Sequence, residues 1–357
     1  MVSRTSSLSL LGVTAAFALA VGLCSCAPAN TSRAESGAAR TVLFCFWNVE
    51  NFFDDTDNGH KTEPDRSFDK WFSSKPEDLK LKLDNLTRAL LALNDGKGPD
   101  ILALAEVENV RAAELLKEHL NKGLKDEALH YTHILIKDPK GGRSIMTAIL
   151  TRLPVDKDRT QLHGRRLRIL EGHIQVNGHD LVIFATHWTS RVSDKEGEGR
   201  DKYADTIYGR FRAMYKSNPK VAFLVCGDFN DPPDEDSVIK HLHAIGDAKK
   251  VKEGGEDGPL MLNLFVKFGE EGKGSHYYRG KWMMFDQIVV SPGLLDGDDG
   301  WTVEPETVKI ITEHTTYTAG RSKGHPHPFG NENFKGERGW SDHFPVTVRL
   351  KVAPAGP

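Results

Sequence analysis

Residues 221–230 read VAFLVCGDFN, and this stretch decides the fold more than any other part of the chain. It opens on an unbroken apolar run, which is typical of a β-strand covered on both faces. The run then ends in polar residues, with Asp228 and Asn230 following at once. Because ligands of α/β proteins bind beyond the ends of strands, the same pattern at other strands would indicate a shared site.

Further apolar runs carry, at one end, a residue that can bind metal or phosphate. The runs are 41–48, 100–105, 180–187, 285–291 and 343–351, and the polar residues are Asn48, Glu106, His187, Asp286, Asp342 and His343. A single Asn or Asp in such a place is usually a turn former. The recurrence at successive strand ends argues against coincidence and predicts one acidic, oxygen-rich pocket with two histidines.

This set of polar side chains suits Mg²⁺ or Mn²⁺, since hard cations prefer carboxylate, amide and water oxygens. The sequence has no HExxH motif, no G-x-S-x-G elbow and no phosphate-binding P-loop. Oxygen ligands beside histidines indicate phosphoryl chemistry, in which one or two metal ions offset developing charge and a histidine activates water.

Short strand-like runs alternate with helical ones, which predicts a layered α/β protein with mixed sheets and helices outside. Helices are expected at 75–93, 110–121, 202–216 and 236–244. The first should begin with a capping box formed by Ser74 and Glu77. Segments 251–280 and 313–340 are expected to be long loops.

Residues 1–26 differ from the rest of the chain, because an apolar run follows Arg4 and ends in LCSC. This is typical of a signal peptide with a lipobox, and it predicts lipidation at Cys26. The alternative is ordinary cleavage and secretion. Residues 27–39 are small and polar, which suits a flexible tether. We expect an exported protein, periplasmic or on the cell surface, that meets the membrane only through its lipid anchor.

The 357 residues carry 39% hydrophobic and 27% charged side chains, which excludes a disordered or fibrous chain. The net charge is −3, so any polyanion must be held locally. Segment 137–168 has nine Lys or Arg against three acids, and it is either a phosphate-tracking surface or a solvated hairpin. Cys45 and Cys226 lie in apolar runs and are expected to be buried free thiols.

The motifs resemble those of the endonuclease/exonuclease/phosphatase superfamily, which includes DNase I. They occur in the order WNVENFFD (47–54), LALAEVEN (102–109), ATHWTSR (185–191), CGDFND (226–231), MFDQIVVS (284–291) and WSDHFPV (340–346). The resemblance implies a four-layer α/β sandwich over 40–352, with two mixed β-sheets flanked by helices. The longer strings HWTSR (187–191) and YYRGKWMMFDQIVVS (277–291) look most like those of exported bacterial members of unassigned substrate.

The resemblance also implies roles for the site residues. Asn48, Glu106 and Asp342 would bind the metal, with Glu106 as the principal ligand. Asp228 and Asn230 would contact the phosphate or the attacking water, or join a metal shell. His343 would be the general base or would orient the nucleophile, and Asp286 would accept its other N–H. His187 would bind a non-bridging phosphate oxygen.

Other side chains could hold the substrate. Arg191 or Arg200 could form a fork on a phosphate, although ordinary ion pairing is an equal alternative. Tyr278 and Trp282 could stack on a base or sugar, or belong to the core and rim. Residues 259–268 (PLMLNLFVKF) could form a membrane-contacting hairpin or be core.

The function expected is therefore that of an extracytoplasmic, Mg²⁺-dependent phosphodiesterase, with nuclease action on a nucleic acid favoured. Phosphomonoesterase or phospholipase action on the same site is the first alternative. A non-catalytic cell-surface binding module is the second, since a fold does not guarantee chemistry. No obligate protein partner is inferred.

Overall fold

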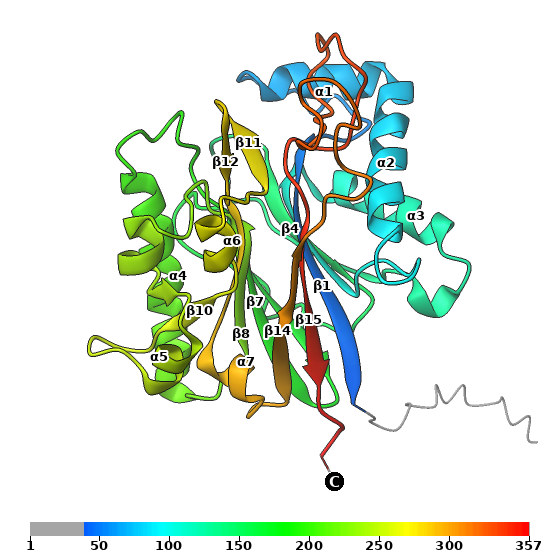
Figure 1. Ribbon diagram of the computed structural model, residues 1–357. Helices are drawn as coiled ribbons and strands as arrows, with labels where there is room; N and C mark the ends of the chain where they lie inside the picture. Colours follow the sequence, from blue (N-terminus) through cyan, green and yellow to red (C-terminus); the bar gives the residue numbers. More distant parts are fainter. Residues whose placement is uncertain (1–38, 357) are drawn as a thin grey trace, which may run out of the picture. The chain divides into compact units, whose positions relative to one another are not determined.

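The computed structural model describes residues 39–356. The predicted signal peptide (1–26), with Cys26, and residues 27–38 of the predicted tether lie outside the described residues. The described part is a mixed α/β structure built on two large β-sheets, with helices on their outer faces (Figure 1). Among its helices none is long and apolar enough to cross a membrane.

Both sheets are mixed, which confirms the predicted fold class. The six-stranded sheet has the order β14 (Trp301–Ile310), β15 (Val346–Val352), β1 (Arg40–Phe52), β2 (Ile101–Val107), β4 (Met146–Thr151), β3 (His133–Ile136). The seven-stranded sheet has the order β5 (Gln161–Leu162), β6 (Ile169–Val176), β7 (His179–His187), β8 (Phe223–Asp228), β13 (Asp286–Val290), β10 (Met261–Asn263), β9 (Ala244–Ile245). A separate hairpin is formed by β11 (His276–Tyr278) and β12 (Lys281–Met283).

Helices cover the outer face of each sheet. The six-stranded sheet packs against α1 (Asp65–Ser74), α2 (Pro76–Leu91) and α3 (Val110–Gly123). The seven-stranded sheet packs against α4 (Glu198–Ser217) and the π-helical turn η2 (Ser237–His241). The short elements are the 3₁₀ turn η1 (Glu127–Leu129), α5 (Ala248–Glu253), α6 (Val266–Glu270) and α7 (Pro292–Asp296).

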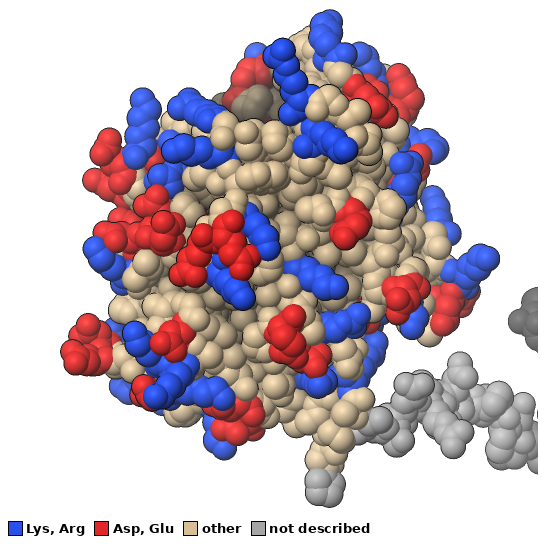
Figure 2. Space-filling model, viewed as in Figure 1, with Lys and Arg blue, Asp and Glu red and all other residues tan. Residues whose placement is uncertain are grey.

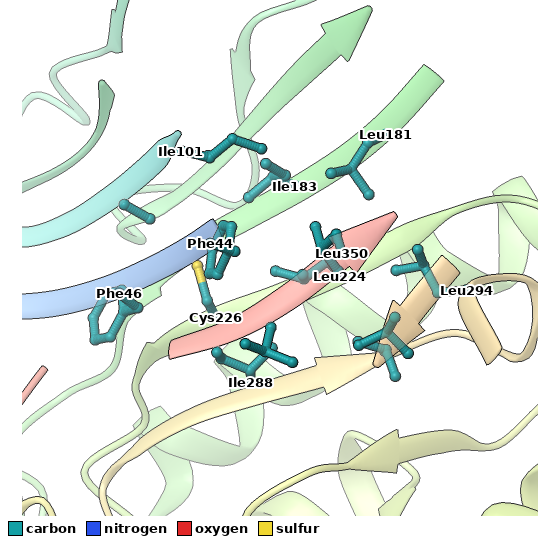
Figure 3. Packing of buried hydrophobic residues seen from close by; sticks show 14 of the residues in the cluster. Phe44, Phe46, Ile101, Leu181, Ile183, Leu224, Cys226, Ile288, Leu294 and Leu350 are labelled. Atoms are coloured by element: carbon teal, nitrogen blue, oxygen red, sulfur yellow. The ribbon is translucent and has the colours of Figure 1, made fainter. Parts of the chain in front are cut away.

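The apolar strands are buried on both faces because each face meets a different layer. In β1, Phe44 and Phe46 point into the core between the sheets, whereas Cys45 and Trp47 point toward the helices. This alternation follows from the two-residue period of a strand. Figure 3 shows the inner face, where the side chains of β1 meet Leu224, Cys226, Ile288 and Leu350 from other strands.

The two cysteines of the described region are free, as expected. Cys45 belongs to the core on the helix side and Cys226 to the core between the sheets, and both are fully buried. Burial raises the pKa of both thiols, so they behave as small apolar side chains.

The predicted capping box at Ser74 is wrong. Ser74 is the last residue of α1, and its hydroxyl donates to the carbonyl of Lys70. Pro76 opens α2 at a position where its missing N–H costs nothing, and Lys75 precedes it without a side-chain cap. The helix predicted at 75–93 therefore begins after a break that the leucine spacing alone did not reveal.

Segment 251–280 is also more ordered than expected, because it contains β10, α6 and β11. Within residues 259–268, Met261, Leu262, Leu264 and Phe265 are buried in the core. The core interpretation of this stretch is therefore confirmed. Between β14 and β15, in contrast, the chain forms neither a helix nor a strand, as expected for 313–340.

Substitution of Gly227 tests how closely β7 and β8 approach each other. A Cβ at this position would lie 2.3 Å from the carbonyl oxygen of Thr186, so Gly227→Ala must push the strands apart. Overpacking of this kind costs about 1–3 kcal/mol, and we expect Tm to fall by about 5 °C. Gly209→Ala in α4 is the matched control, since a Cβ there would have no heavy atom within 4 Å and the helix should gain stability. An equal Tm for both variants would contradict the tight contact.

Candidate active site

Strand registers bring the polar strand ends together at one edge of the two sheets. In the seven-stranded sheet His187 pairs with Asp228 across parallel strands, and Asp286 pairs with Asp228 across antiparallel strands. In the six-stranded sheet Phe46 pairs with Val346, which places the residues before β15 beside the end of β1. Side chains at paired positions share one face, so His187, Asp228 and Asp286 lie side by side.

Glu106 lies at a break in the pairing of β2 with β4. The register shifts between Leu104 and Val107, and Glu106 has a φ of 63°, a region that L-residues rarely adopt. Its carboxylate accepts a hydrogen bond from the backbone N–H of Asn51 at 2.8 Å. A bulge of this kind redirects a side chain, and here it accompanies a carboxylate at the sheet edge.

The side-chain amide of Asn48 connects the two sheets. Its Nδ2 donates to Glu106 Oε1 at 3.2 Å and to Asp228 Oδ2 at 3.1 Å. Asp228 is 2% exposed and also accepts from the backbone N–H of Asn230 at 2.9 Å. Burial raises the pKa of Asp228, against the opposing charge of His343.

His343 and Asp286 form a buried pair. The Nδ1 atom of His343 lies 2.7 Å from Asp286 Oδ2, and the same oxygen accepts from the hydroxyl of Ser275. The Nε2 atom of His343 lies 3.8 Å from Asp228 Oδ2. Burial alone would lower the pKa of His343, but the charges of Asp286 and Asp228 raise it well above its usual value. Asp286 therefore sets both the orientation of the ring and its affinity for a proton.

His187 faces the same carboxylates but carries no charge. Its Nε2 lies 3.7 Å from Asp228 Oδ2 and 3.8 Å from Glu106 Oε1. Burial lowers the pKa of His187 to about 3, so the imidazole is neutral at physiological pH. Asn230 is held nearby, with its Nδ2 donating to the carbonyl of Trp188 at 3.1 Å.

The structure adds His276, which the sequence reasoning missed. Its ring stacks on His343 with centroids 4.3 Å apart, and its Nδ1 lies 2.7 Å from the carbonyl oxygen of Asp342. One ligand atom from each of His276, Asp342 and His343 lies within 4.8 Å of the other two. His276 lies in a segment expected to be a loop, so only its short distance along the chain from Asp286 could have singled it out.

Lys82 and Glu50 hold the segment that carries Asp342 and were also missed. Lys82 is fully buried in α2, and its Nζ donates to the carbonyl of Trp340 at 2.7 Å. The carboxylate of Glu50 accepts from the backbone N–H groups of Phe329 and Gly330 at 2.7 and 3.0 Å. Burial lowers the pKa of Lys82 to about 8 and raises that of Glu50 to about 8. A helical lysine gives no sequence signal for such a role.

The two predicted phosphate-binding arginines are engaged within the chain. Arg191 bonds to Asp231 at 2.7 Å and to Glu235 at 3.0 Å. Arg200 is 3% exposed, and its Nε lies 2.7 Å from Asp231. This geometry favours the ion-pair alternative for both, and a phosphate fork gains no support from it.

The two predicted stacking residues, Tyr278 and Trp282, both belong to the β11–β12 hairpin. Tyr278 is 36% exposed and stacks toward His276, with ring centroids 6.1 Å apart. Trp282 is half-buried and packs against Phe344 and His325. Tyr278 is thus open to a ligand, whereas Trp282 is largely engaged in packing.

The donor set fits a hard divalent cation. Glu106, Asp228 and Asp342 supply carboxylates and Asn48 supplies an amide, which are the ligands that such ions prefer. Burial raises the pKa of the Asp228 carboxyl, and a cation beside this carboxyl would favour its charged form.

Comparisons with known proteins identify the family and agree with the fold. A family model described as the endonuclease/exonuclease/phosphatase family matches residues 43–352. An endonuclease/exonuclease/phosphatase family protein from Bacteroides thetaiotaomicron shares the fold at a TM-score of 0.51 and 14% identity, covering 89% of this chain and 97% of that one. TDP2 from Caenorhabditis elegans matches at a TM-score of 0.51 and 16% identity, covering 88% and 75%. No curated protein matches the sequence. The chain belongs to the endonuclease/exonuclease/phosphatase family.

Proposed function

We propose that the protein is a divalent-metal-dependent phosphodiesterase that acts outside the cytoplasm, with nucleic acid as the favoured substrate. The observation that carries the proposal is the His343–Asp286 pair, buried at 2.7 Å and facing Asp228 beside the neutral His187. Members of this family are phosphoester hydrolases, and the polar strand ends supply the groups that such hydrolysis needs.

In this proposal the reaction is an in-line attack of water on phosphorus without a covalent enzyme intermediate. Asp228 and Asn230 orient the water, and the neutral form of His343 accepts its proton at Nε2 while Asp286 stabilises the resulting imidazolium. Because Asp286 and Asp228 raise the pKa of His343, the population of this neutral form increases with pH. His187 donates an N–H to a non-bridging phosphate oxygen, which suits an imidazole kept neutral by burial. The leaving oxygen takes a proton from solvent, and a diester yields a monoester and an alcohol.

A divalent metal fits Asn48, Glu106 and Asp342, with Asp228 able to join them. When bound, such an ion offsets charge on the phosphate and lowers the pKa of nearby water. We propose Mg²⁺ or Mn²⁺ because carboxylate and amide oxygens suit these ions. The Asn48 amide, whose Nδ2 faces Glu106 and Asp228, would turn its oxygen toward such an ion.

A phosphomonoesterase or phospholipase would use the same groups, so the substrate has to be settled by experiment. Met261 and Phe265 are buried, so segment 259–268 does not expose these side chains to a membrane. This weakens the phospholipase alternative. On the face shown in Figure 2, Lys and Arg are interspersed with Asp and Glu, so that face carries no extended basic strip for nucleic acid. Binding of a polyanion must then depend on residues close to the site.

The first test compares substrates with and without EDTA. We expect the purified protein with Mg²⁺ to cleave bis-p-nitrophenyl phosphate and plasmid DNA or RNA, and EDTA to abolish this. Activity confined to p-nitrophenyl phosphate, inositol phosphates or sphingomyelin would keep the site but exclude the nuclease. Metal binding by calorimetry without turnover of any ester would favour the binding module.

The same assay tests the metal ligands. Glu106→Gln keeps the size of the side chain but removes its charge, so the Mg²⁺ concentration for half-maximal activity should rise at least about tenfold. Glu118→Gln, an exposed position of α3, is the matched control and should leave the titration unchanged. An identical Mg²⁺ dependence in both variants would exclude Glu106 as a ligand.

His343→Ala tests the proposed base. We expect kcat to fall by about 10²–10⁴, because positioned proton transfer contributes that much. His241→Ala removes a histidine that is 36% exposed and lies outside the site, and should retain full activity. Circular dichroism should show the native fold for both. Normal turnover by a folded His343→Ala protein would remove this residue from the mechanism.

We also propose that the protein is exported and anchored through a lipid on Cys26, with simple secretion as the alternative. Cys26→Ser should move the protein from the membrane fraction to the soluble extracytoplasmic fraction, since the acyl chains supply the membrane affinity. Cys24→Ser is the matched control, because it removes the neighbouring thiol and keeps Cys26. The same membrane-bound share in wild type and Cys26→Ser would contradict the lipobox.

A further inference from the structure

A cavity of about 330 Å³ lies between the segment after His187 and the β11–β12 hairpin. It is lined by Arg191, Val192, Lys195, Tyr278, Arg279 and Met283. In Figure 1 the yellow hairpin and the green loop that precedes α4 lie at the same end of the sheets. That end also carries the polar strand ends of the candidate active site.

A row of stacked rings connects this cavity with the site. Tyr278 stacks toward His276 at a centroid distance of 6.1 Å, and His276 stacks on His343 at 4.3 Å. The backbone of the hairpin is joined to the same place, since His276 forms a β-bridge with His343. A substrate whose scissile phosphate lies at His343 would therefore extend naturally along the hairpin into the cavity.

The cavity carries positive charge that the protein does not neutralise. None of its six lining residues is acidic, and Arg191 is already paired with Asp231 and Glu235. Within residues 39–356, neither Lys195 nor Arg279 forms an ion pair. Of the two acids that flank Lys195, Asp194 is bonded to Arg200, whereas Glu196 is exposed and is not among the lining residues. Two cations are thus free to bind an anionic group.

The hairpin turn holds one of these cations in place. Arg279 and Gly280 have φ values of 48° and 84° and connect two strands in a two-residue turn. The guanidinium lies over the Tyr278 ring, 5.0 Å from its centroid. This contact restrains an exposed guanidinium beside a partly exposed ring, which reduces the conformational freedom lost when a ligand binds.

The lining combines two free cations with an aromatic ring and the apolar side chains of Val192, which is 66% exposed, and Met283. A phosphate joined to a flat base matches this combination, because the cations bind the phosphate and the apolar surface contacts the base. Of the two aliphatic lining residues, Val192 is exposed and Met283 is half-buried, so this surface offers little apolar area to a bilayer. The lining therefore favours a nucleotide unit.

We propose that this cavity binds the nucleotide unit next to the scissile phosphate of a single-stranded nucleic acid, with Lys195 and Arg279 holding its phosphate. The proposal rests on the proposed phosphodiesterase function and specifies its substrate class. It also explains how a chain of net charge −3 could hold a polyanion: the binding charge is concentrated beside the site.

The test is the salt dependence of binding. A fluorescent single strand of about 12 nucleotides is titrated with full-length protein in EDTA, from about 50 to 200 mM salt. Each lost phosphate contact reduces the slope of log Kd against log salt by about 0.7, so Lys195→Ala/Arg279→Ala should lose about 1.4. Tyr278→Leu should weaken binding roughly tenfold through lost stacking, with little change in slope.

The matched control is Lys249→Ala/Lys252→Ala, which removes two positive charges from α5, away from the hairpin in Figure 1. It should leave the slope within experimental error. Equal slopes for the two double variants would overturn the proposal. It would also be overturned if Lys195→Ala/Arg279→Ala lost binding to phosphatidylserine vesicles but kept its binding to the oligonucleotide. Wild-type hydrolysis of bis-p-nitrophenyl phosphate is measured in parallel: its absence contradicts the proposed function, whereas an unchanged slope with active enzyme contradicts only the cavity.

Discussion

Face-to-face packing of the two sheets is the constraint on which the rest of the structure depends. The central strands β1 and β8 bury Phe44, Phe46 and Leu224 against each other, and a slip of one residue would turn these side chains away from the inter-sheet core toward the helices. With the registers thus held, the polar residues at the strand ends must meet at one edge. The bond between His343 and Asp286 crosses from one sheet to the other at that edge, at 2.7 Å.

The buried carboxylates and the unusual backbone angle of the site cost folding free energy, and contacts with the surrounding protein offset that cost. Asp228 and Asp286 are buried carboxylates on neighbouring strands, and Glu106 adopts a φ of 63°. Buried charges and unusual backbone angles persist only where the surroundings hold them in place. Here the holding groups are the backbone N–H groups of Asn51 and Asn230 and the side chain of Asn48. The same charges suit the site to a divalent cation.

Long-range contacts also position Asp342, which comes at the end of a segment without regular structure. Lys82 and Asn85 of α2 bind the carbonyls of Trp340 and Gly339, and Glu50 binds two backbone N–H groups of the same segment. Polar groups of one helix thus replace the hydrogen bonds that a helix or strand would have supplied. These contacts join the segment before Asp342 to α2 and to the end of β1.

The sequence by itself determined the fold class, the main strands and the polar residues at their ends, because apolar runs and the residues that end them are local features. It could not show the internal pairing of Arg191 and Arg200, the contact of Lys82 with the segment before Asp342, or the presence of His276 beside His343. Each of these depends on partners far away in the chain: Asp231 for the arginines, the Asp342 carbonyl for His276, and Trp340 for Lys82. Only the tertiary structure decided them, because contacts between distant segments leave no periodic trace in the sequence.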